Sequence, residues 1–429
     1  MTKFAIFFCS LGLLPIAGFA QTMLEYAPAP PDNPLKGFVP YVTADAWERF
    51  PHSMEFTYFA INDLMQDYET FDWSPIEKVL KTTQERACQL TFRVMMEYPD
   101  RGVLVPQFLV DEGVKITKWK SDESDSGVCD TPDYEDPRLR RALQSFIAAI
   151  GKKYDGDPRL SYLTAGILGL WGEWHNYPRA ELGASKETER IVLNAYEKAF
   201  SQTPVLLRYP ANEGHYAHAE NNRRPFGYHD DSFNWATLDT GRKQDNWFFI
   251  PLLKASGAFE KWKTQPIGGE LRPELWKASF TDLPHKRSQG FETCVEESHA
   301  SWLMDSGLFE KRFPLPPERK AKALKAAQML GYEFHISQWE IADREIRITV
   351  ENRGVAPFYH GWLVELEANR EILARFDLRG ILPGQATTWT AKVGADGANY
   401  RLRVPNPMKG GKPLRFANLE QDDEWLVLP

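Results

Sequence analysis

The chain has 429 residues, of which 26% are charged, and its formal net charge is −8. This length exceeds what a single hydrophobic core usually supports, so we expect a large domain joined to a smaller one. Because no stretch is rich in Lys and Arg, the sequence argues against nucleic acid or an anionic membrane as a partner.

Residues 1–20 have the pattern of an export signal. A mostly apolar run over residues 4–16 precedes Gly18 and Ala20, two small residues at the positions that a signal peptidase reads. We expect the mature chain to begin near Gln21 and to be a periplasmic or extracellular monomer. No later stretch approaches the roughly 18 uninterrupted apolar residues of a membrane span, so none is expected.

The mature chain keeps three cysteines, Cys88, Cys129 and Cys294. Their odd number permits at most one disulfide within the chain, and Cys129 with Cys294 is the pair we expect. None belongs to a CxxC pair, which argues against zinc ribbons and thioredoxin-like chemistry.

Short apolar strands alternate with amphipathic helices along residues 21–330. A capping box at Ser74–Glu77 opens one helix, Asp136 and Pro137 open a second, and a third is expected from about Lys186 to Phe200. The expected strands cover residues 39–42, 55–61, 90–96, 163–170, 204–209, 224–231, 265–270 and 299–304. Eight such units match a (β/α)8 TIM barrel in the α/β class, whereas doubly wound sheets seldom contain eight parallel strands.

The pattern changes after residue 314. A helix over residues 318–330 ends at Gly331, and short alternating strands separated by turn residues then predict an antiparallel β-sandwich of about 100 residues. We therefore divide the chain into a signal peptide (1–20), a barrel (21–330) and a C-terminal β-sandwich (331–429). The sandwich either binds carbohydrate through Trp339, Tyr359 or Trp362 or braces the barrel, and bracing is the commoner role.

The stretch Leu163–His175 holds the first candidate for catalysis. Its apolar part predicts a strand buried on both faces, and Glu173 follows between Trp171 and Trp174. A carboxylate buried there without a partner would cost several kcal/mol, and ligands bind at the carboxyl ends of barrel strands. The sequence therefore predicts a functional Glu173, although an ion pair with a nearby arginine is the simpler alternative.

A second carboxylate, Glu270, ends the seventh expected strand. It follows Glu173 by 97 positions, about three βα units, so both acids should face the same mouth of the barrel. Gly268 and Gly269 leave room for a ligand beside it. The residues expected to contact substrate are Arg93, Trp171, Trp174, His175, Arg208, Tyr209, His229, Asp230, Arg272 and Trp302.

Two carboxylates across a barrel mouth suit glycoside hydrolysis without a cofactor, because one can donate a proton while the other attacks or activates water. Aromatic residues form 13% of the chain, and their flat faces suit sugar rings. Burial among indoles predicts a raised pKa for Glu173, whereas Glu270 should stay ionised beside Arg272.

A metal site is the alternative use of the polar residues near these strands. Its candidate ligands would be His175, His229, Asp230 and Asp231, with His215 and His218 on a loop nearby. Their spacing matches no metal-binding motif, so side chains that line a polar pocket are the commoner interpretation.

The two-carboxylate arrangement resembles that of retaining (β/α)8 glycoside hydrolases. More closely, the chain resembles the secreted bacterial glycosidase-like proteins described as DUF4832 and DUF4874. The motifs that carry this resemblance are NPLKGF at 33–38, FDWSPIEKVL at 71–80, GLWGEWH at 169–175, Glu270 and the C-terminal module.

The resemblance implies that Glu173 is the general acid/base and Glu270 the nucleophile. Two positions depart from the superfamily pattern. Gly172 stands where an Asn usually precedes the acid/base, and Arg93 on the third strand is the nearest counterpart of the usual strand-two Arg. The expected function is a secreted glycoside hydrolase with a retaining two-carboxylate mechanism, and the alternative is a non-catalytic glycan-binding or surface-scaffold protein.

Residues 98–133 form an insertion after the third strand, so they should rise from the face that carries Glu173. With Tyr98, Trp119 and the acidic residues 122–125, the insertion should border the pocket and set substrate length. The alternative is a solvated loop without such contacts.

Overall fold

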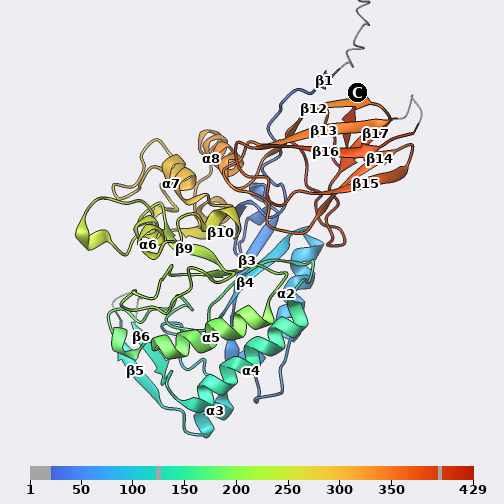
Figure 1. Cartoon of the computed structure of the whole chain (residues 1–429). Coiled ribbons are helices and arrows are strands. Elements are labelled where there is room, and N and C mark those ends of the chain that lie inside the picture. Colours follow the sequence, from blue (N-terminus) through green and yellow to red (C-terminus); the bar gives the residue numbers. More distant parts are fainter. Residues whose placement is uncertain (1–20, 122–126, 395–398) are drawn as a thin grey trace, which may run out of the picture.

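The computed structural model describes residues 21–121, 127–394 and 399–429. In this part of the chain eight parallel strands form one sheet, and an antiparallel sandwich lies at one end of it (Figure 1). The sheet closes on itself, because Tyr41, just beyond the first strand, pairs in parallel with Phe56 on the strand at the opposite edge. Eight closed parallel strands with helices outside form a (β/α)8 barrel, as the sequence predicts.

The barrel strands follow one another around the sheet in chain order. They are β2 (Gly37–Val39), β3 (Met54–Ala60), β4 (Gln89–Met95), β7 (Leu160–Thr164), β8 (Val205–Leu207), β9 (Gly227–Phe233), β10 (Ile267–Leu271) and β11 (Trp302–Met304). The α-helices are α1 (Ile61–Leu64), α2 (Ser74–Glu85), α3 (Gln107–Asp111), α4 (Pro137–Tyr154), α5 (Lys186–Ala199), α6 (Phe249–Ser256), α7 (Phe291–Ser298) and α8 (Pro317–Met329). The insertion after β4 adds the hairpin of β5 (Ile116–Lys120) and β6 (Val128–Pro132).

The helix starts follow the expected chemistry with one exception. The side chain of Asp136 caps α4 by accepting a hydrogen bond from the backbone N–H of Arg138. At α2, however, the predicted capping box is not formed, because Ser74 is already the first helical residue. Asp72, two residues earlier, accepts the hydrogen bond from the Ser74 N–H instead.

The sandwich contains two antiparallel sheets of four strands each. One sheet consists of β1 (Thr22–Met23), β12 (Phe334–Ala342), β13 (Glu345–Asn352) and β16 (Ala386–Lys392), and the other of β14 (Leu363–Ala368), β15 (Glu371–Asp377), β17 (Tyr400–Arg403) and β18 (Leu426–Leu428). Because β1 pairs with β12, the start of the described chain belongs to the sandwich rather than to the barrel.

The sandwich covers the end of the barrel where the parallel strands begin. The Tyr359 hydroxyl donates to the Trp262 carbonyl just before β10, and the Lys412 ammonium donates to the His52 carbonyl just before β3. Trp362 is buried in the shared core at 8% exposure. Two of the three aromatic residues considered for carbohydrate binding are thus packed inside the protein, which favours bracing.

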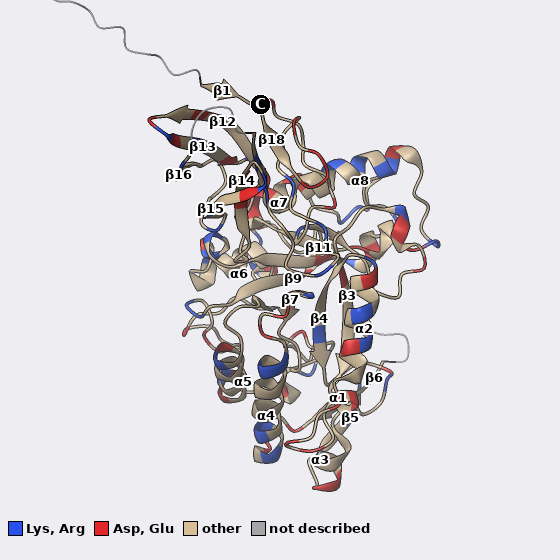
Figure 2. Ribbon diagram, turned by 90° about the vertical axis from the view of Figure 1, so that its right-hand side faces the viewer, with Lys and Arg blue, Asp and Glu red and all other residues tan. Residues whose placement is uncertain are grey.

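Charges of both signs are distributed along α2, α5 and α8, as Figure 2 shows. Within the described residues, none of the helices combines the length and the apolar character needed to cross a bilayer.

Candidate active site

The loop that carries Glu173 begins earlier than its apolar sequence predicts. Strand β7 ends at Thr164, so the expected strand over residues 163–170 is wrong beyond that point. The φ angles of Ile167, Trp171 and Trp174 are 75°, 53° and 60°, a left-handed conformation that no strand contains. The apolar residues are nevertheless buried, because the loop folds back over the end of the barrel.

Backbone hydrogen bonds attach this loop to the end of β4. The Ile167 N–H donates to the Val94 carbonyl at 2.7 Å, and the Trp171 N–H donates to the Glu97 carbonyl at 3.0 Å. Gly172 has a φ of 70°, and a Cβ there would lie 3.2 Å from Cδ of Arg93. A glycine therefore stands before Glu173 because the backbone is left-handed and closely approaches an arginine.

Arg93 is the central cation of the site. Its side chain is 2% exposed, and its guanidinium lies 2.8 Å from Oδ1 of Asp231 and 3.6 Å from Oε1 of Glu173. It also lies over the ring of Tyr58, 5.8 Å from the centroid. Strands β3, β4 and β9 and the loop after β7 thus bring their polar side chains to one point.

Asp231 holds two further groups in place beneath this point. Its Oδ2 lies 3.0 Å from Nε of Arg208, and its Oδ1 lies 3.0 Å from Nδ1 of His229. Arg93, Arg208 and His229 lower the pKa of the Asp231 carboxyl despite its burial, whereas burial lowers the pKa of His229. Asp231 is therefore a buried anion surrounded by hydrogen-bond donors.

Glu270 lies at the end of β10, in the same mouth of the barrel. The Tyr41 hydroxyl donates to its Oε1 at 3.4 Å, and the side chain is 6% exposed. Burial and the charges of Asp231 and Glu173 raise the pKa of Glu270 to about 8. The expectation that Glu270 stays ionised is therefore wrong for the free protein, in which it holds a proton at neutral pH.

Glu173 is the more accessible of the two carboxylates, with 19% of its side chain exposed. Its Oε1 faces Arg93, and its Oε2 lies 3.5 Å from Nε2 of His175. Glu173 is close enough to Glu270 for its charge to raise that residue's pKa. The two acids thus share one site in different surroundings.

Four of the predicted substrate contacts have other roles. Trp302 is fully buried and stacks on Tyr162 inside the barrel. Asp230 accepts hydrogen bonds from the Ser232 N–H and the Thr237 hydroxyl outside the barrel interior. Arg272 donates to Glu274 and Ser232 at the rim, and the indole of Trp174 donates to the Ala165 carbonyl within its own loop.

No family model matches the sequence, and no curated protein matches it. Among solved structures, endoglycoceramidase II from Rhodococcus sp. is 10% identical, with a TM-score of 0.41 over 86% of this chain and 96% of its own. A glucosidase from Croceicoccus marinus is 10% identical, with a TM-score of 0.37 over 85% and 95% of the two chains. An exo-β-1,4-mannosidase from Opitutaceae bacterium strain TAV5 is 13% identical, with a TM-score of 0.36 over 65% and 49%.

All three of these structural neighbours are glycoside hydrolases. The resemblance to the DUF4832 and DUF4874 proteins receives no support from the family models. The barrel itself is established by its own strand pairing.

The insertion after β4 borders the site. Trp119 in β5 and Cys129 in β6 pack against Leu170 of the loop that carries Glu173. The ring of Tyr98 lies edge-on to Trp171, with the centroids 6.3 Å apart. The insertion is therefore not a loop without contacts, and its hairpin packs against the loop that carries Glu173.

The predicted disulfide between Cys129 and Cys294 is wrong. Both thiols are free and buried, and they belong to separate hydrophobic clusters. The acidic run at 122–125 lies outside the described residues.

Tyr41 and Tyr58 belong to the site although the sequence does not indicate them. Asp231, which the sequence indicates only as a possible metal ligand, is the buried partner of Arg93. Successive side chains of a strand point to opposite faces, so His229 and Asp231 point into the barrel while Asp230 points outward. The alternation of side-chain direction along β9 is the sequence signal that assigns Asp231, and not Asp230, to the barrel interior. Tyr58 alternates in the same way on β3 and lies below Arg93.

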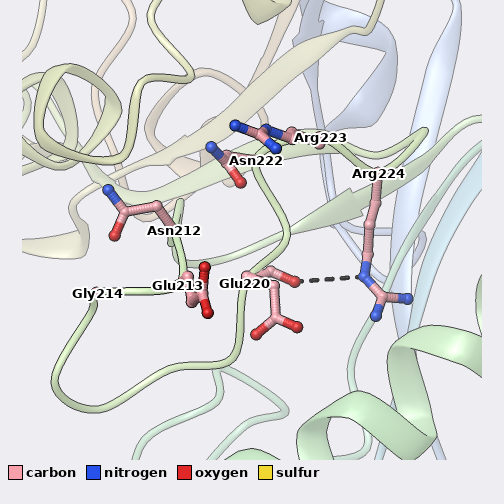
Figure 3. Close-up of a pocket in the computed structure, with 7 residues that line it drawn as sticks. All are labelled: Asn212, Glu213, Gly214, Glu220, Asn222, Arg223 and Arg224. Carbon is pink, nitrogen blue, oxygen red and sulfur yellow. Dashed lines mark hydrogen bonds between the residues drawn. The ribbon is translucent and has the colours of Figure 1, made fainter.

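A surface cavity of about 330 Å³ lies under the loop between β8 and β9 (Figure 3). It is lined by Asn212, Glu213, Gly214, Glu220, Asn222, Arg223 and Arg224. None of these lining residues belongs to the carboxylate cluster. His215 and His218 of the same loop hydrogen-bond within the loop and to Glu189, so they do not join His229.

Proposed function

We propose that the protein is an exported glycoside hydrolase of the DUF4832/DUF4874 type that acts on a poly- or oligosaccharide through Glu173 and Glu270. The observation that carries the proposal is the pair itself: a buried acid with a pKa of about 8 beside a more exposed carboxylate that faces Arg93 and His175. Glycoside hydrolysis needs one protonated and one ionised carboxyl group.

The electrostatics favour Glu270 as the proton donor. Glu270 holds its proton at neutral pH, and Tyr41 fixes its orientation. Glu173 is the more exposed of the two carboxylates, so we assign to it the attack on the anomeric carbon with retention of configuration. This assignment reverses the roles that the sequence resemblance implies.

The remaining residues fit a sugar site. Trp171 and Tyr98 provide partly exposed aromatic faces beside Glu173, and Arg93 with Asp231 forms a rigid polar floor. The insertion bounds one side of the mouth and limits the length of the substrate.

The test is a screen of aryl glycosides and of bacterial and plant polysaccharides with the mature chain. We expect hydrolysis that Glu173→Gln and Glu270→Gln each reduce by about 10²-fold or more, the usual contribution of a positioned acid or base. Glu274→Gln, at the rim two residues from Arg272, is the matched control and should retain activity. Proton NMR of the first product should show the retained anomer.

Azide rescue separates the two roles. With Glu270→Ala, azide should restore turnover and give a glycosyl azide of retained configuration, because the nucleophile Glu173 is intact. With Glu173→Ala, the azide product should be inverted. The opposite pair of products would assign the proton donor to Glu173.

A binding protein is the second candidate, and the ion pair between Arg93 and Glu173 favours it, because a permanently paired carboxylate is poor at attack. Such a protein would bind an oligosaccharide without releasing product, and Glu173→Gln would weaken the binding.

A further inference from the structure

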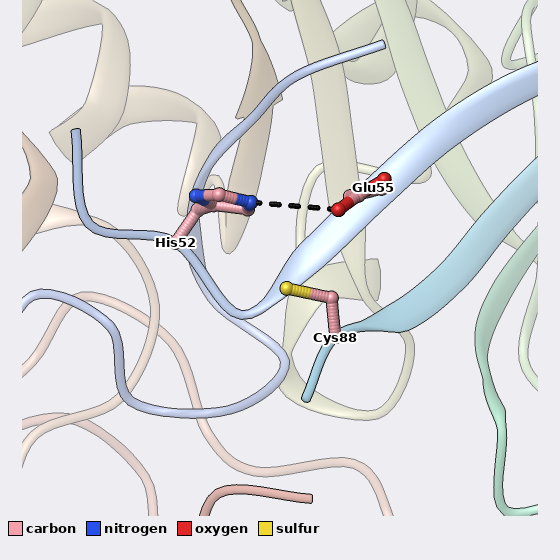
Figure 4. Close-up of side chains that lie close together, drawn as sticks. All are labelled: His52, Glu55 and Cys88. Carbon is pink, nitrogen blue, oxygen red and sulfur yellow. Dashed lines mark ion pairs between the residues drawn. The ribbon is translucent and has the colours of Figure 1, made fainter. Parts of the chain in front are cut away.

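A second cluster of ligand side chains lies at the opposite end of the barrel from the carboxylates. It consists of His52, Glu55 and Cys88 (Figure 4). His52 precedes β3, Glu55 lies at the start of β3, and Cys88 directly precedes β4. One donor atom from each lies within 4.8 Å of the others, and the three residues are 4%, 0% and 1% exposed.

The hydrogen bonding of His52 defines which nitrogen is available. Its Nδ1 lies 3.0 Å from the Phe50 carbonyl, which can only accept, so Nδ1 carries the hydrogen. Nε2 of the neutral ring then presents a lone pair toward Oε1 of Glu55, 3.7 Å away. Within the described chain neither of these two buried atoms has a hydrogen-bond partner. A buried lone pair that faces a carboxylate oxygen requires a proton or a cation between them.

Glu55 is oriented in the manner of a metal ligand. Arg86 donates to its Oε2 at 3.0 Å, which leaves Oε1 directed at His52. Metal-binding His residues usually donate their second nitrogen to a backbone carbonyl, and metal-binding carboxylates are themselves hydrogen-bonded. The Phe50 carbonyl and Arg86 provide these two supports.

Cys88 completes the set. Its buried Sγ is the third donor atom of the cluster, and the thiol donates to the Arg86 carbonyl at 3.4 Å. A bound divalent cation deprotonates a coordinating thiol outright, and the proton leaves to solvent. Lys412, the other nearby cation, pairs with Asp32 at 3.0 Å.

We propose that His52, Glu55 and Cys88 form a structural zinc site. Nitrogen, oxygen and sulfur ligands in one set suit Zn²⁺, and the three residues would occupy three of its four tetrahedral positions. Bonds of about 2.0–2.1 Å in this geometry place a nitrogen and an oxygen roughly 3.4 Å apart. The observed 3.7 Å therefore needs a contraction of only a few tenths of an ångström. One carboxylate and one thiolate balance the charge of the ion.

The site connects the segment before β3 with the starts of two barrel strands, beneath the sandwich. Lys412 of the sandwich donates to the carbonyl of His52 itself, so the ligand segment is also part of the junction between the two domains. Residues at this end of a barrel contribute to stability rather than to catalysis, so we assign the ion a structural role.

The experiment uses the full mature chain after dialysis against a chelator. Titration with Co²⁺ should give one equivalent bound and a thiolate-to-cobalt charge-transfer band in the near ultraviolet, and Zn²⁺ should displace the cobalt and raise the melting temperature. Cys88→Ser should lose the band and bind Zn²⁺ at least about tenfold more weakly. Cys294→Ser, which removes a fully buried thiol elsewhere, is the matched control and should behave as the wild type.

Two results would overturn the proposal. The first is a wild-type chain that binds neither Co²⁺ nor Zn²⁺, which would make His52 and Glu55 a buried ion pair. The second is a cobalt band that persists in Cys88→Ser and disappears in Cys294→Ser. If Cys88→Ser does not fold, the wild-type titration and a titration of Glu55→Gln, which keeps the size of the side chain, replace it. Glu55→Gln should bind Zn²⁺ more weakly than the wild type, and an unchanged affinity would overturn the proposal.

Discussion

At the scale of single residues, the barrel mouth concentrates buried charges. Arg93 and Arg208 depend on Asp231 for their counter-charge. The Asp231 side chain is 2% exposed and contacts both guanidinium groups. Each of these ions would be costly to bury alone, and the network is favourable only while every member is present. Asp231 is therefore a supporting residue on which the geometry of the site depends.

We expect Asp231→Asn to lower the free energy of unfolding by about 3–5 kcal/mol, because two buried guanidinium groups lose their counter-charge. Urea denaturation followed by fluorescence measures this loss. Asp63→Asn, at an exposed position on α1, is the control and should change stability by less than about 0.5 kcal/mol. Equal stabilities of the two variants would contradict the network.

The protonation of Glu270 predicts the alkaline limit of activity. A general acid works while protonated, and the pKa of Glu270 is about 8, so kcat/KM should fall as the pH rises through about 8. A pH–rate profile of the wild type measures this limb. An activity that falls only below pH 6 and stays constant above pH 8 would show that Glu270 is not the donor.

At the scale of elements, one buried carboxylate joins the loop that carries Glu173 to the hairpin of β5 and β6. Glu97, just beyond β4, accepts hydrogen bonds from Thr131 in β6, from Tyr134 before α4 and from Asn176 in the segment that follows Glu173. Its side chain is 1% exposed, and burial raises its pKa to about 7. The hairpin and the loop are therefore held together by a group that titrates near neutral pH.

The folded protein binds the Glu97 proton more tightly than the unfolded chain, so its stability should fall as the pH rises from about 4.5 through 7. The full effect of this shift is about 3 kcal/mol. Melting temperatures between pH 4 and 9 measure the slope, which Glu97→Gln should reduce. Glu112→Gln at an exposed position should leave the slope unchanged, and an unaltered slope in Glu97→Gln would contradict the assignment.

The contact between Tyr98 and Trp171 places the insertion beside the mouth. We expect Tyr98→Ala to change the ratio of kcat/KM between short and long oligosaccharides, because it removes an aromatic face at one edge of the site. Tyr216→Ala, which removes an 84% exposed ring on another loop, is the control. A ratio that is equal in both variants would mean that the insertion does not contact the substrate.

At the scale of the whole molecule, the barrel and the sandwich share one core. Met54, Tyr162 and Trp302 of the barrel interior belong to the same buried cluster as Phe334 and Val364 of the sandwich. The sandwich covers the N-terminal end of the barrel. The mouth lies at the opposite end, where the loops that follow the strands surround it.

Because the core is shared, we expect the chain to unfold in a single calorimetric transition and a truncation after residue 330 to be insoluble or molten. Removing the sandwich exposes barrel residues that are otherwise buried, at a cost of roughly 25 cal/mol for each Å² of apolar surface. A soluble barrel fragment with a cooperative melting transition would contradict this view.

The sequence alone determined the barrel, the sandwich and the place of both carboxylates in the chain. Apolar periodicity and turn residues are local properties, and they act the same way wherever the segment finally lies. For that reason the sequence predicts the eight strands to within a few residues, apart from the end of β7, and places Glu270 at the end of β10. Glu173 lies in the loop after β7 and not at the end of that strand.

Only the tertiary structure decided what the side chains at these positions do. The pKa of Glu270 depends on charges from β9 and from the loop after β7, which are distant in the chain and meet only in the closed barrel. The left-handed turn before Glu173 arises from its contacts with β4, and His52, Glu55 and Cys88 meet only because β3 and β4 start side by side. Electrostatics and coordination depend on distances between atoms, and those distances are set by the packing of the whole chain.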